Sequence, residues 1–295
     1  MIDSAANAGF THGKIQGLYS YELTQREDFE DASTASFRPY EKEFARLNKL
    51  DLSPEDEEWF VSACADSGIT AMITVFTHHG VERARSAGFK SVKIASYDCS
   101  SLPIIRKIAD FADEIIVSTG ATSWQEIATT AMYLETLKDL GKSVGLLHAR
   151  TVYPATPEVT GLGRMMAMKA FGLPVGFSDH SRPQDDNLLA SRFALLLGAE
   201  IIERHYTVLE KNETKDGPVS INEHEAKKLS SFAQMSYVKK VNSILGELNL
   251  LGEYIDIENL EPLELELQNL KYYRGRVISV ISGKSVPSWE TSPFD

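Results

Sequence analysis

Short runs of apolar and β-branched residues recur between residues 12 and 207, and segments of helical character separate most of them. This alternation is typical of βα units, in which helices cover a parallel sheet. We therefore expect an α/β fold. The seven predicted strands are HGKIQ (12–16), ITAMITV (69–75), SVKIAS (91–96), EIIVSTG (114–120), VGLLHA (144–149), LPVGFSDH (173–180) and EIIERHYT (200–207).

Two of the segments between these strands carry clear signals for the start of a helix. Ser53 is a candidate N-cap, and Pro54 follows it at the first helical position. Ser123 stands three residues before Glu126, which is the spacing of a capping box. A further helix is expected near residues 223–246.

Strands that alternate with helices in this way favour a (β/α)8 TIM barrel, which needs eight strands. The missing strand should be the first, because residues 1–9 resemble the end of a helix. We expect a TIM-barrel domain over residues 1–250 that lacks strand 1, followed by a C-terminal extension at 251–295. The long polar segments at 17–50 and 208–223 predict loops over the mouth of the barrel.

Composition narrows the class of protein further. Two cysteines, Cys64 and Cys99, are too few for a disulfide framework or a cysteine-rich zinc site. The net charge of −12 argues against nucleic acid as a partner, because a phosphate backbone needs clustered Lys and Arg. No signal peptide or long apolar run is visible, which favours a cytoplasmic protein with no membrane partner. A small anionic substrate stays compatible with this charge, since it needs only a few converging cations.

Polar residues fall within or at the carboxyl ends of the predicted strands, which form the catalytic face of a TIM barrel. Any one of them alone is more simply explained as a hydrogen-bonded structural residue or a solvated charge. Their joint placement on six strands favours a functional site, because apolar strands bury polar groups only with compensation. These residues are Lys14, Lys93, Ser96, Ser118, His148, Ser178, His180, Glu203 and His205.

The last two strands suggest a metal site. His180 and His205 can bind one divalent metal ion through neutral imidazole nitrogens, with water and substrate oxygens as further ligands. Glu203 lies on the same face of its strand as His205. It is a candidate third ligand, or a partner that orients an imidazole.

The lysines and serines suggest an anion site. Lys14 and Lys93, with the hydroxyl groups of Ser96, Ser118 and Ser178, are suited to bind a phosphate or a carboxylate. The Ser-Thr-Gly sequence that begins at Ser118 precedes a helix, whose first backbone N–H groups would add donors. Ser-Thr-Gly alone is also a common turn and helix cap, so the two lysines carry this interpretation.

With these motifs, the chain resembles the sialic acid (N-acetylneuraminate) synthase family. The pairing of Ser-Asp-His with Glu-Arg-His-Tyr-Thr about 25 residues later is the most specific part of the resemblance. The similar stretches are KIQ (14–16), VKIAS (92–96), IIVSTGA (115–121), LLHARTVYP (146–154), VGFSDHS (175–181) and IIERHYT (201–207).

The resemblance implies a metal-dependent condensation of phosphoenolpyruvate with the open-chain aldehyde of an N-acylated hexosamine, which gives a nine-carbon 2-keto sugar acid and phosphate. It implies Mn²⁺ or Mg²⁺ on His180 and His205. Catalytic roles would fall to Lys93, Asp98 and Glu203, with Asp98 in place of a family Glu. The substrate-binding residues it implies are Lys14, Lys93, Ser96, Ser118, Ser178 and Tyr153.

The chain also departs from the family pattern. It shows neither the usual first strand nor the C-terminal antifreeze-like domain, and a tail containing YYRGR stands where that domain would begin. Two alternatives therefore stay open: a metal-dependent sugar aldolase or lyase, and a degenerate relative that binds a sugar acid without turnover. A homo-oligomer is compatible with the sequence.

Overall fold

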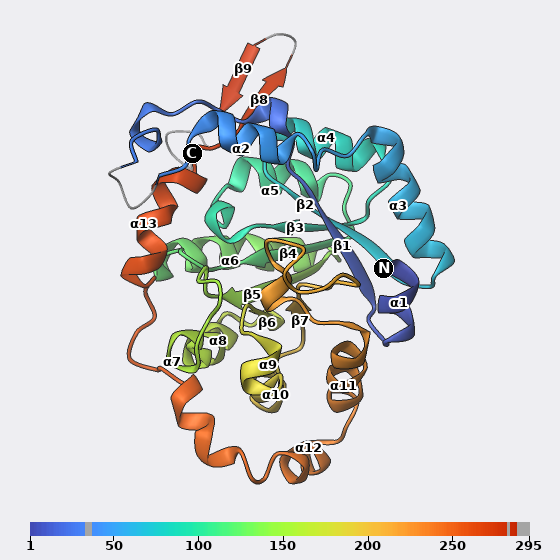
Figure 1. The fold of residues 1–295 in the computed structure, drawn as a ribbon, viewed down its shortest axis with the longest axis vertical. Coiled ribbons are helices and arrows are strands. Elements are labelled where there is room, and N and C mark those ends of the chain that lie inside the picture. Colours follow the sequence, from blue (N-terminus) through green and yellow to red (C-terminus); the bar gives the residue numbers. More distant parts are fainter. Residues whose placement is uncertain (33–36, 282–283, 288–295) are drawn as a thin grey trace.

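The structure is a computed structural model, and it describes residues 1–32, 37–281 and 284–287. A curled parallel sheet of seven strands lies at its centre, with the strands side by side in chain order (Figure 1). All seven strands predicted from the sequence are confirmed. They are β1 (His12–Gly17), β2 (Thr70–Val75), β3 (Ser91–Ile94), β4 (Glu114–Ser118), β5 (Ser143–Ala149), β6 (Val175–Asp179) and β7 (Ile202–Arg204).

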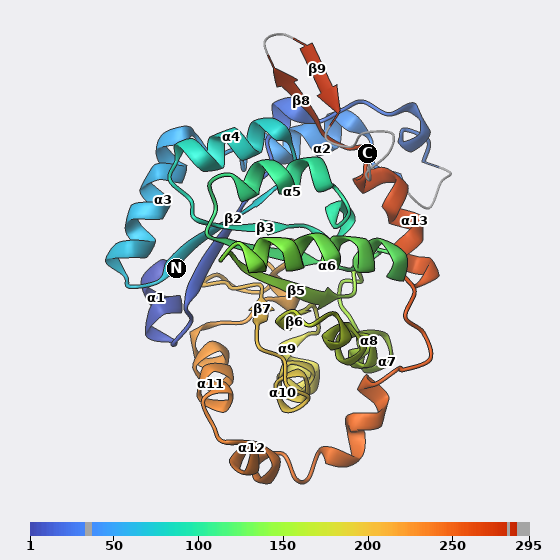
Figure 2. The ribbon, with the colours of Figure 1, turned by 180° about the vertical axis from the view of Figure 1, so that it is seen from behind.

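Helices cover the outer side of this sheet (Figure 2). Those between the strands are α2 (Tyr40–Leu47), α3 (Pro54–Asp66), α4 (His78–Ser86), α5 (Leu102–Ala109), α6 (Trp124–Asp139), α7 (Pro157–Thr160), α8 (Leu162–Met168), α9 (Pro183–Asp186) and α10 (Leu189–Leu196). The predicted N-caps are confirmed: the Ser53 hydroxyl accepts from the backbone N–H of Asp56, and Ser123 caps Glu126 in the same way. No described helix is both long and apolar enough to cross a membrane.

The two faces of the sheet differ because side chains alternate along a strand. On β3, Val92 and Ile94 point outward into the large apolar core between the sheet and the helices. Lys93, between them, points inward and lines a cavity. The inner face also holds a small apolar cluster, which includes Met72 and Ile116. The sequence therefore directs one set of strand residues to the core and the other to the interior of the curl.

The two outermost strands, β1 and β7, each pair with one neighbouring strand in the described part of the chain. Helix α1 (Ile2–Asn7) contacts both α3 and α11 (Glu223–Ala233), and so connects the two sides. Asp3 accepts a hydrogen bond from Ser67, just after α3, at 2.6 Å, and Ser4 donates one to Glu223 at 2.5 Å. The sheet thus has the shape of a TIM-barrel-like fold in which seven strands are described, and the absence of a first strand stays a prediction.

Two expectations about the connecting segments were wrong in detail. The 17–50 segment contains α2, where we expected only a loop. Leu47 is buried and Phe44 stacks on Tyr40, so a short apolar stripe supports this helix. The helix expected near 223–246 is two helices, α11 and α12 (Tyr237–Ser243).

The C-terminal extension runs along the outside of the fold and reaches the mouth of the curl (Figure 1). It contains α13 (Glu264–Tyr273) and the antiparallel hairpin of β8 (Ile278–Ile281) and β9 (Lys284–Pro287). Val277 forms a bridge with Leu23, so the extension pairs with the 17–50 segment. Both segments therefore lie beside the site described next.

Candidate active site

A cavity of about 670 Å³ lies at the carboxyl ends of the parallel strands. Its wall contains all ten residues for which we expected a catalytic, substrate-binding or metal-binding role, whereas His148 lies elsewhere. These residues are Lys14, Lys93, Ser96, Asp98, Ser118, Tyr153, Ser178, His180, Glu203 and His205. The inward direction of alternate strand residues brings them together from strands that are far apart in sequence.

Glu203 connects the two lysines. Lys93 Nζ donates a hydrogen bond to Glu203 Oε1, and Ser178 Oγ donates to the same oxygen at 2.7 Å. Lys14 Nζ lies 4.0 Å from Glu203 Oε2 and donates to Thr74 Oγ1 at 3.2 Å. Burial alone would raise the pKa of Glu203, but the charges of Lys93 and Lys14 outweigh it and hold that pKa below its usual range.

The charge of Lys14 is less firmly held. Burial lowers the pKa of its ammonium group to about 8, although the carboxylate of Glu203 opposes this shift. Lys14 therefore loses its positive charge in the free protein at a pH where an ordinary lysine keeps it.

His180 is held in one orientation and in its neutral form. Its Nδ1 lies 2.7 Å from the carbonyl oxygen of Arg150, so Nδ1–H donates there and the Nε2 lone pair faces the cavity. The Tyr153 hydroxyl donates a hydrogen bond to that Nε2 at 2.9 Å, and the two rings stack with centroids 4.0 Å apart. Burial, together with the neighbouring His205, lowers the pKa of His180 to about 3.

His205 stands beside His180, with the two ring centroids 5.6 Å apart. Its Nδ1 lies 3.8 Å from Asp216 Oδ2, and burial lowers its pKa although Asp216 opposes the shift. Neutral imidazoles are common metal ligands, and the oxygen ligands that Mn²⁺ and Mg²⁺ favour would come from water and substrate. Within the described residues, no group of three or more His, Cys, Asp or Glu side chains is arranged to hold a metal ion. A metal ion would thus have these two imidazoles as its protein ligands, and it stays a prediction.

Ser96 and Ser118 lie at the turn after β4. Ser118 Oγ is buried and has no hydrogen-bond partner in the part of the chain that is described. A Cβ atom added to Gly120 would lie 2.8 Å from Thr151 Cγ2 and 3.0 Å from Ser96 Oγ, so only glycine fits there. Among the described residues this hydroxyl is therefore available to donate a hydrogen bond into the cavity.

The expected donors at the N-terminus of α6 are already used, which corrects the sequence interpretation. The backbone N–H of Ala121 donates to Glu266 at 3.0 Å, and that of Trp124 donates to Glu261 at 3.1 Å. Both acceptors belong to the C-terminal extension. The Ser-Thr-Gly segment therefore offers the Ser118 hydroxyl to the cavity, while backbone N–H groups at the start of the following helix are bound by carboxylates of the chain.

Of two further polar residues, Asp98 lies in the cavity wall and His148 does not. Asp98 ends the short 3-10 helix Ser96–Asp98 after β3, and it is buried in the cavity wall. His148 is absent from the cavity wall, because it shares the outward face of β5 with Val144 and Leu146. Its Nε2 bonds the carbonyl oxygen of Thr160 at 2.8 Å, so His148 is a structural residue.

Sequence reasoning missed the outer wall of the cavity. The 17–50 segment contributes Arg38, Glu43 and Arg46, and the extension contributes Asn269, Tyr273 and Arg276. No local signal assigns these residues to a site, because they reach it through contacts between distant segments. The basic and aromatic YYRGR sequence was the one hint.

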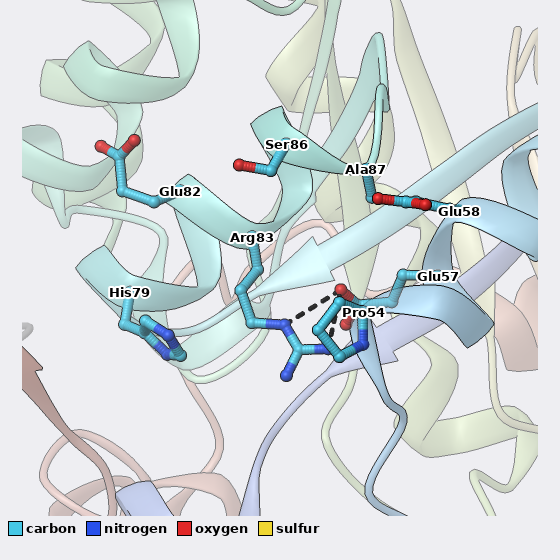
Figure 3. Close-up of a pocket in the computed structure, with 8 residues that line it drawn as sticks. All are labelled: Pro54, Glu57, Glu58, His79, Glu82, Arg83, Ser86 and Ala87. Carbon is cyan, nitrogen blue, oxygen red and sulfur yellow. Dashed lines mark hydrogen bonds and ion pairs between the residues drawn. The ribbon is translucent and has the colours of Figure 1, made fainter.

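A second, smaller hollow of about 290 Å³ lies between α3 and α4 and shares no lining residue with the first cavity (Figure 3). Arg83 dominates it and pairs with Glu57 at 3.0 Å. The guanidinium also packs over the ring of Tyr19 at 4.3 Å. Its principal charged group is thus paired within the fold, which is typical of a structural contact.

The curled parallel sheet, with its polar cavity at the strand ends, defines an α/β protein of the TIM-barrel type. The model of the NeuB family matches residues 1–248. The chain belongs to the NeuB family, and its resemblance to sialic acid synthases is confirmed.

The named relatives are sugar acid synthases. The chain is 27% identical over 252 residues to the N,N'-diacetyllegionaminic acid synthase of Campylobacter jejuni, covering 84% of this chain and 72% of that protein. It is 29% identical over 228 residues to the synthase of the same name from Legionella pneumophila, covering 75% of this chain and 59% of that one.

Solved structures support the fold. A sialic acid synthetase from Leptospira borgpetersenii superposes with a TM-score of 0.67 at 24% identity, covering 92% of this chain and 84% of that one. A spore coat polysaccharide biosynthesis protein from Bacillus subtilis gives a TM-score of 0.69 at 22% identity, covering 96% and 77%.

Proposed function

We propose that this protein condenses phosphoenolpyruvate with the open-chain aldehyde of an N-acylated hexosamine, giving a nine-carbon 2-keto sugar acid and phosphate. The main support is the convergence of two lysines, unpaired or exchangeable hydroxyl groups and two neutral histidines on one cavity. The family membership agrees with this chemistry, because the named relatives are sugar acid synthases.

The lysine side of the cavity is the proposed binding site for phosphoenolpyruvate. Lys14 and Lys93 supply positive charge, and Ser96, Ser118 and Ser178 supply hydroxyl donors. The phosphate can take the hydrogen bond that Ser118 lacks. Fixed cations at this place also stabilise the charge that the departing phosphate gains.

The histidine side is the proposed place of a divalent metal ion, Mn²⁺ or Mg²⁺, on His180 and His205. When bound, such an ion would act as a Lewis acid toward a carbonyl oxygen. The hydrogen bond from His180 Nδ1 to the Arg150 carbonyl fixes the ring, which is how second-layer contacts commonly prepare a histidine ligand.

In the proposed reaction, C3 of phosphoenolpyruvate bonds to the aldehyde carbon, water adds to C2, and phosphate leaves. The groups of this chain that can hold or move protons near those carbons are Lys93, Asp98 and Glu203. Glu203 is ionised and holds Lys93 and Ser178 in place. We assign the proton of the attacking water to Asp98, which lines the same cavity and stands where the family has a Glu.

The test is release of inorganic phosphate from phosphoenolpyruvate with Mn²⁺ and a panel of N-acetylated hexosamines. We expect release only when both substrates are present, and loss of at least about a hundredfold in Lys93→Ala and His180→Ala, the size typical for losing one such group. Lys271→Ala, an exposed lysine outside the cavity, is the control. A keto acid formed without phosphoenolpyruvate would favour an aldolase instead, and unchanged rates in both variants would reject the assignment.

A further inference from the structure

The positive charge of the cavity is concentrated in its outer wall. On the strands and their adjoining turns, Lys14 and Lys93 are balanced by Asp98 and Glu203. The outer wall, formed by the 17–50 segment, the 208–223 segment and the extension, is different. It carries Arg38, Arg46, Lys215 and Arg276 against Glu43 and Asp216, four cations against two acids and hence two positive charges in excess. In a chain of net charge −12, such a local surplus indicates an anionic ligand.

Among these cations, Arg276 is the best positioned to bind an anion. Its guanidinium lies 5.1 Å from the centre of the Phe76 ring and 4.7 Å from that of Tyr273. Tyr273 in turn stacks on Tyr97, with ring centroids 4.4 Å apart. No hydrogen bond or ion pair joins this guanidinium to another described residue. Aromatic rings thus hold it in place while its N–H groups stay available for a planar, two-point contact with an anion.

The neighbouring charges form one cluster around Glu43. Arg46 binds this carboxylate through two nitrogens, at 2.5 and 3.0 Å. That hydrogen bonding is the main cause that lowers the pKa of Glu43, and the charges of Lys215 and Arg276 lower it further. One carboxylate therefore faces three cations, and it neutralises only one of them.

The wall that carries Arg276 is anchored to the catalytic face. Glu266 of α13 is buried, and its carboxylate accepts from the backbone N–H groups of Ala121 and Thr151 and from the Arg150 guanidinium, at 2.8–3.0 Å. This anchor fixes the position of α13, whose Asn269 and Tyr273 line the cavity. The extension is thus joined to the site by buried contacts.

We propose that Arg276 and the cations beside it form a subsite for an anionic group of the acceptor, so that the acceptor sugar carries a phosphate or carboxylate at the end remote from its aldehyde. This inference rests on the proposed function. Phosphoenolpyruvate is assigned to the lysine side by the unpaired Ser118 hydroxyl, which leaves the outer wall to the second substrate.

The test compares three acceptors that differ only at C6: N-acetylmannosamine, its 6-phosphate and its 6-carboxylate. We expect at least one of the acids to have a kcat/KM at least tenfold above that of the neutral sugar. Arg276→Gln removes that preference and leaves the KM for phosphoenolpyruvate within twofold, while Arg276→Lys retains part of it. Lys271→Gln, which removes a charge from α13 outside the cavity wall, retains all of it.

Equal use of the neutral sugar, or a rise in the KM for phosphoenolpyruvate in Arg276→Gln, overturns the subsite. If none of the three sugars is turned over, the proposed function fails. Calorimetric measurement of sugar binding then tests the Arg276 subsite independently of turnover. In that measurement, the intact protein binds the 6-phosphate or the 6-carboxylate more tightly than the neutral sugar, and Arg276→Gln does not. Equal binding of all three sugars by the intact protein refutes the inference.

Discussion

Replacing Glu266 with Ala tests whether the C-terminal extension is built into the fold. Both side chains of the ion pair between Glu266 and Arg150 are at least 98% buried, since their exposed fractions are 0% and 2%. The carboxylate also accepts from the backbone N–H groups of Ala121, Thr151 and Leu263. Removing it leaves the Arg150 cation buried without its partner, which typically costs about 3–5 kcal/mol of unfolding free energy.

Urea denaturation of the full chain measures this cost. Glu266→Gln keeps the shape and loses the charge, so we expect a smaller loss of about 1–3 kcal/mol. Glu264→Gln is the matched control, because Glu264 is exposed two positions earlier on α13, and it should change stability by less than about 0.5 kcal/mol. If Glu266→Ala loses less than about 1 kcal/mol, the extension is not anchored as described.

Three further predictions concern the cavity. Gly120→Ala places a Cβ 2.8 Å from Thr151, so we expect the KM for phosphoenolpyruvate to rise about tenfold or more. An unchanged KM would contradict phosphate binding beside the turn after β4. Lys14 has a pKa of about 8 and is positively charged below that pH. We therefore expect the affinity of the free protein for phosphoenolpyruvate, measured by calorimetry, to fall as the pH rises from 7 to 9. Lys14→Arg keeps its charge over this range and should remove that fall. Chelation of the metal with EDTA should abolish phosphate release, and added Mn²⁺ should restore it. In a paramagnetic relaxation titration, the His180→Ala variant should bind Mn²⁺ about tenfold or more weakly than the intact protein.

The sequence predicted the strands well because each is a short run with local boundaries. It also predicted which side chains meet, since Lys93 alternates with the core residues Val92 and Ile94. The same alternation counts against His148, which lies in step with Val144 and Leu146 on the outward face. That signal was present in the sequence and was not applied.

The outer wall could not be predicted from the sequence. Arg276 reaches the cavity only because Glu266 is bound at the ends of β4 and β5, more than a hundred residues away in sequence. Glu266 also accepts a hydrogen bond from the backbone N–H of Ala121. From the sequence, we expected N–H groups at this helix start to bind a phosphate or carboxylate of the substrate. A carboxylate of the chain occupies those donors, and local patterns cannot reveal such long-range pairing.

Coupling of phosphoenolpyruvate to a sugar aldehyde at Lys93 would fix the ratio of the two products, which mass spectrometry and a phosphate assay measure together. We predict one nine-carbon keto acid for each phosphate released by the intact protein, and neither product from Lys93→Ala. Keto acid without phosphate, or phosphate without keto acid, would rule out a coupled condensation at this site.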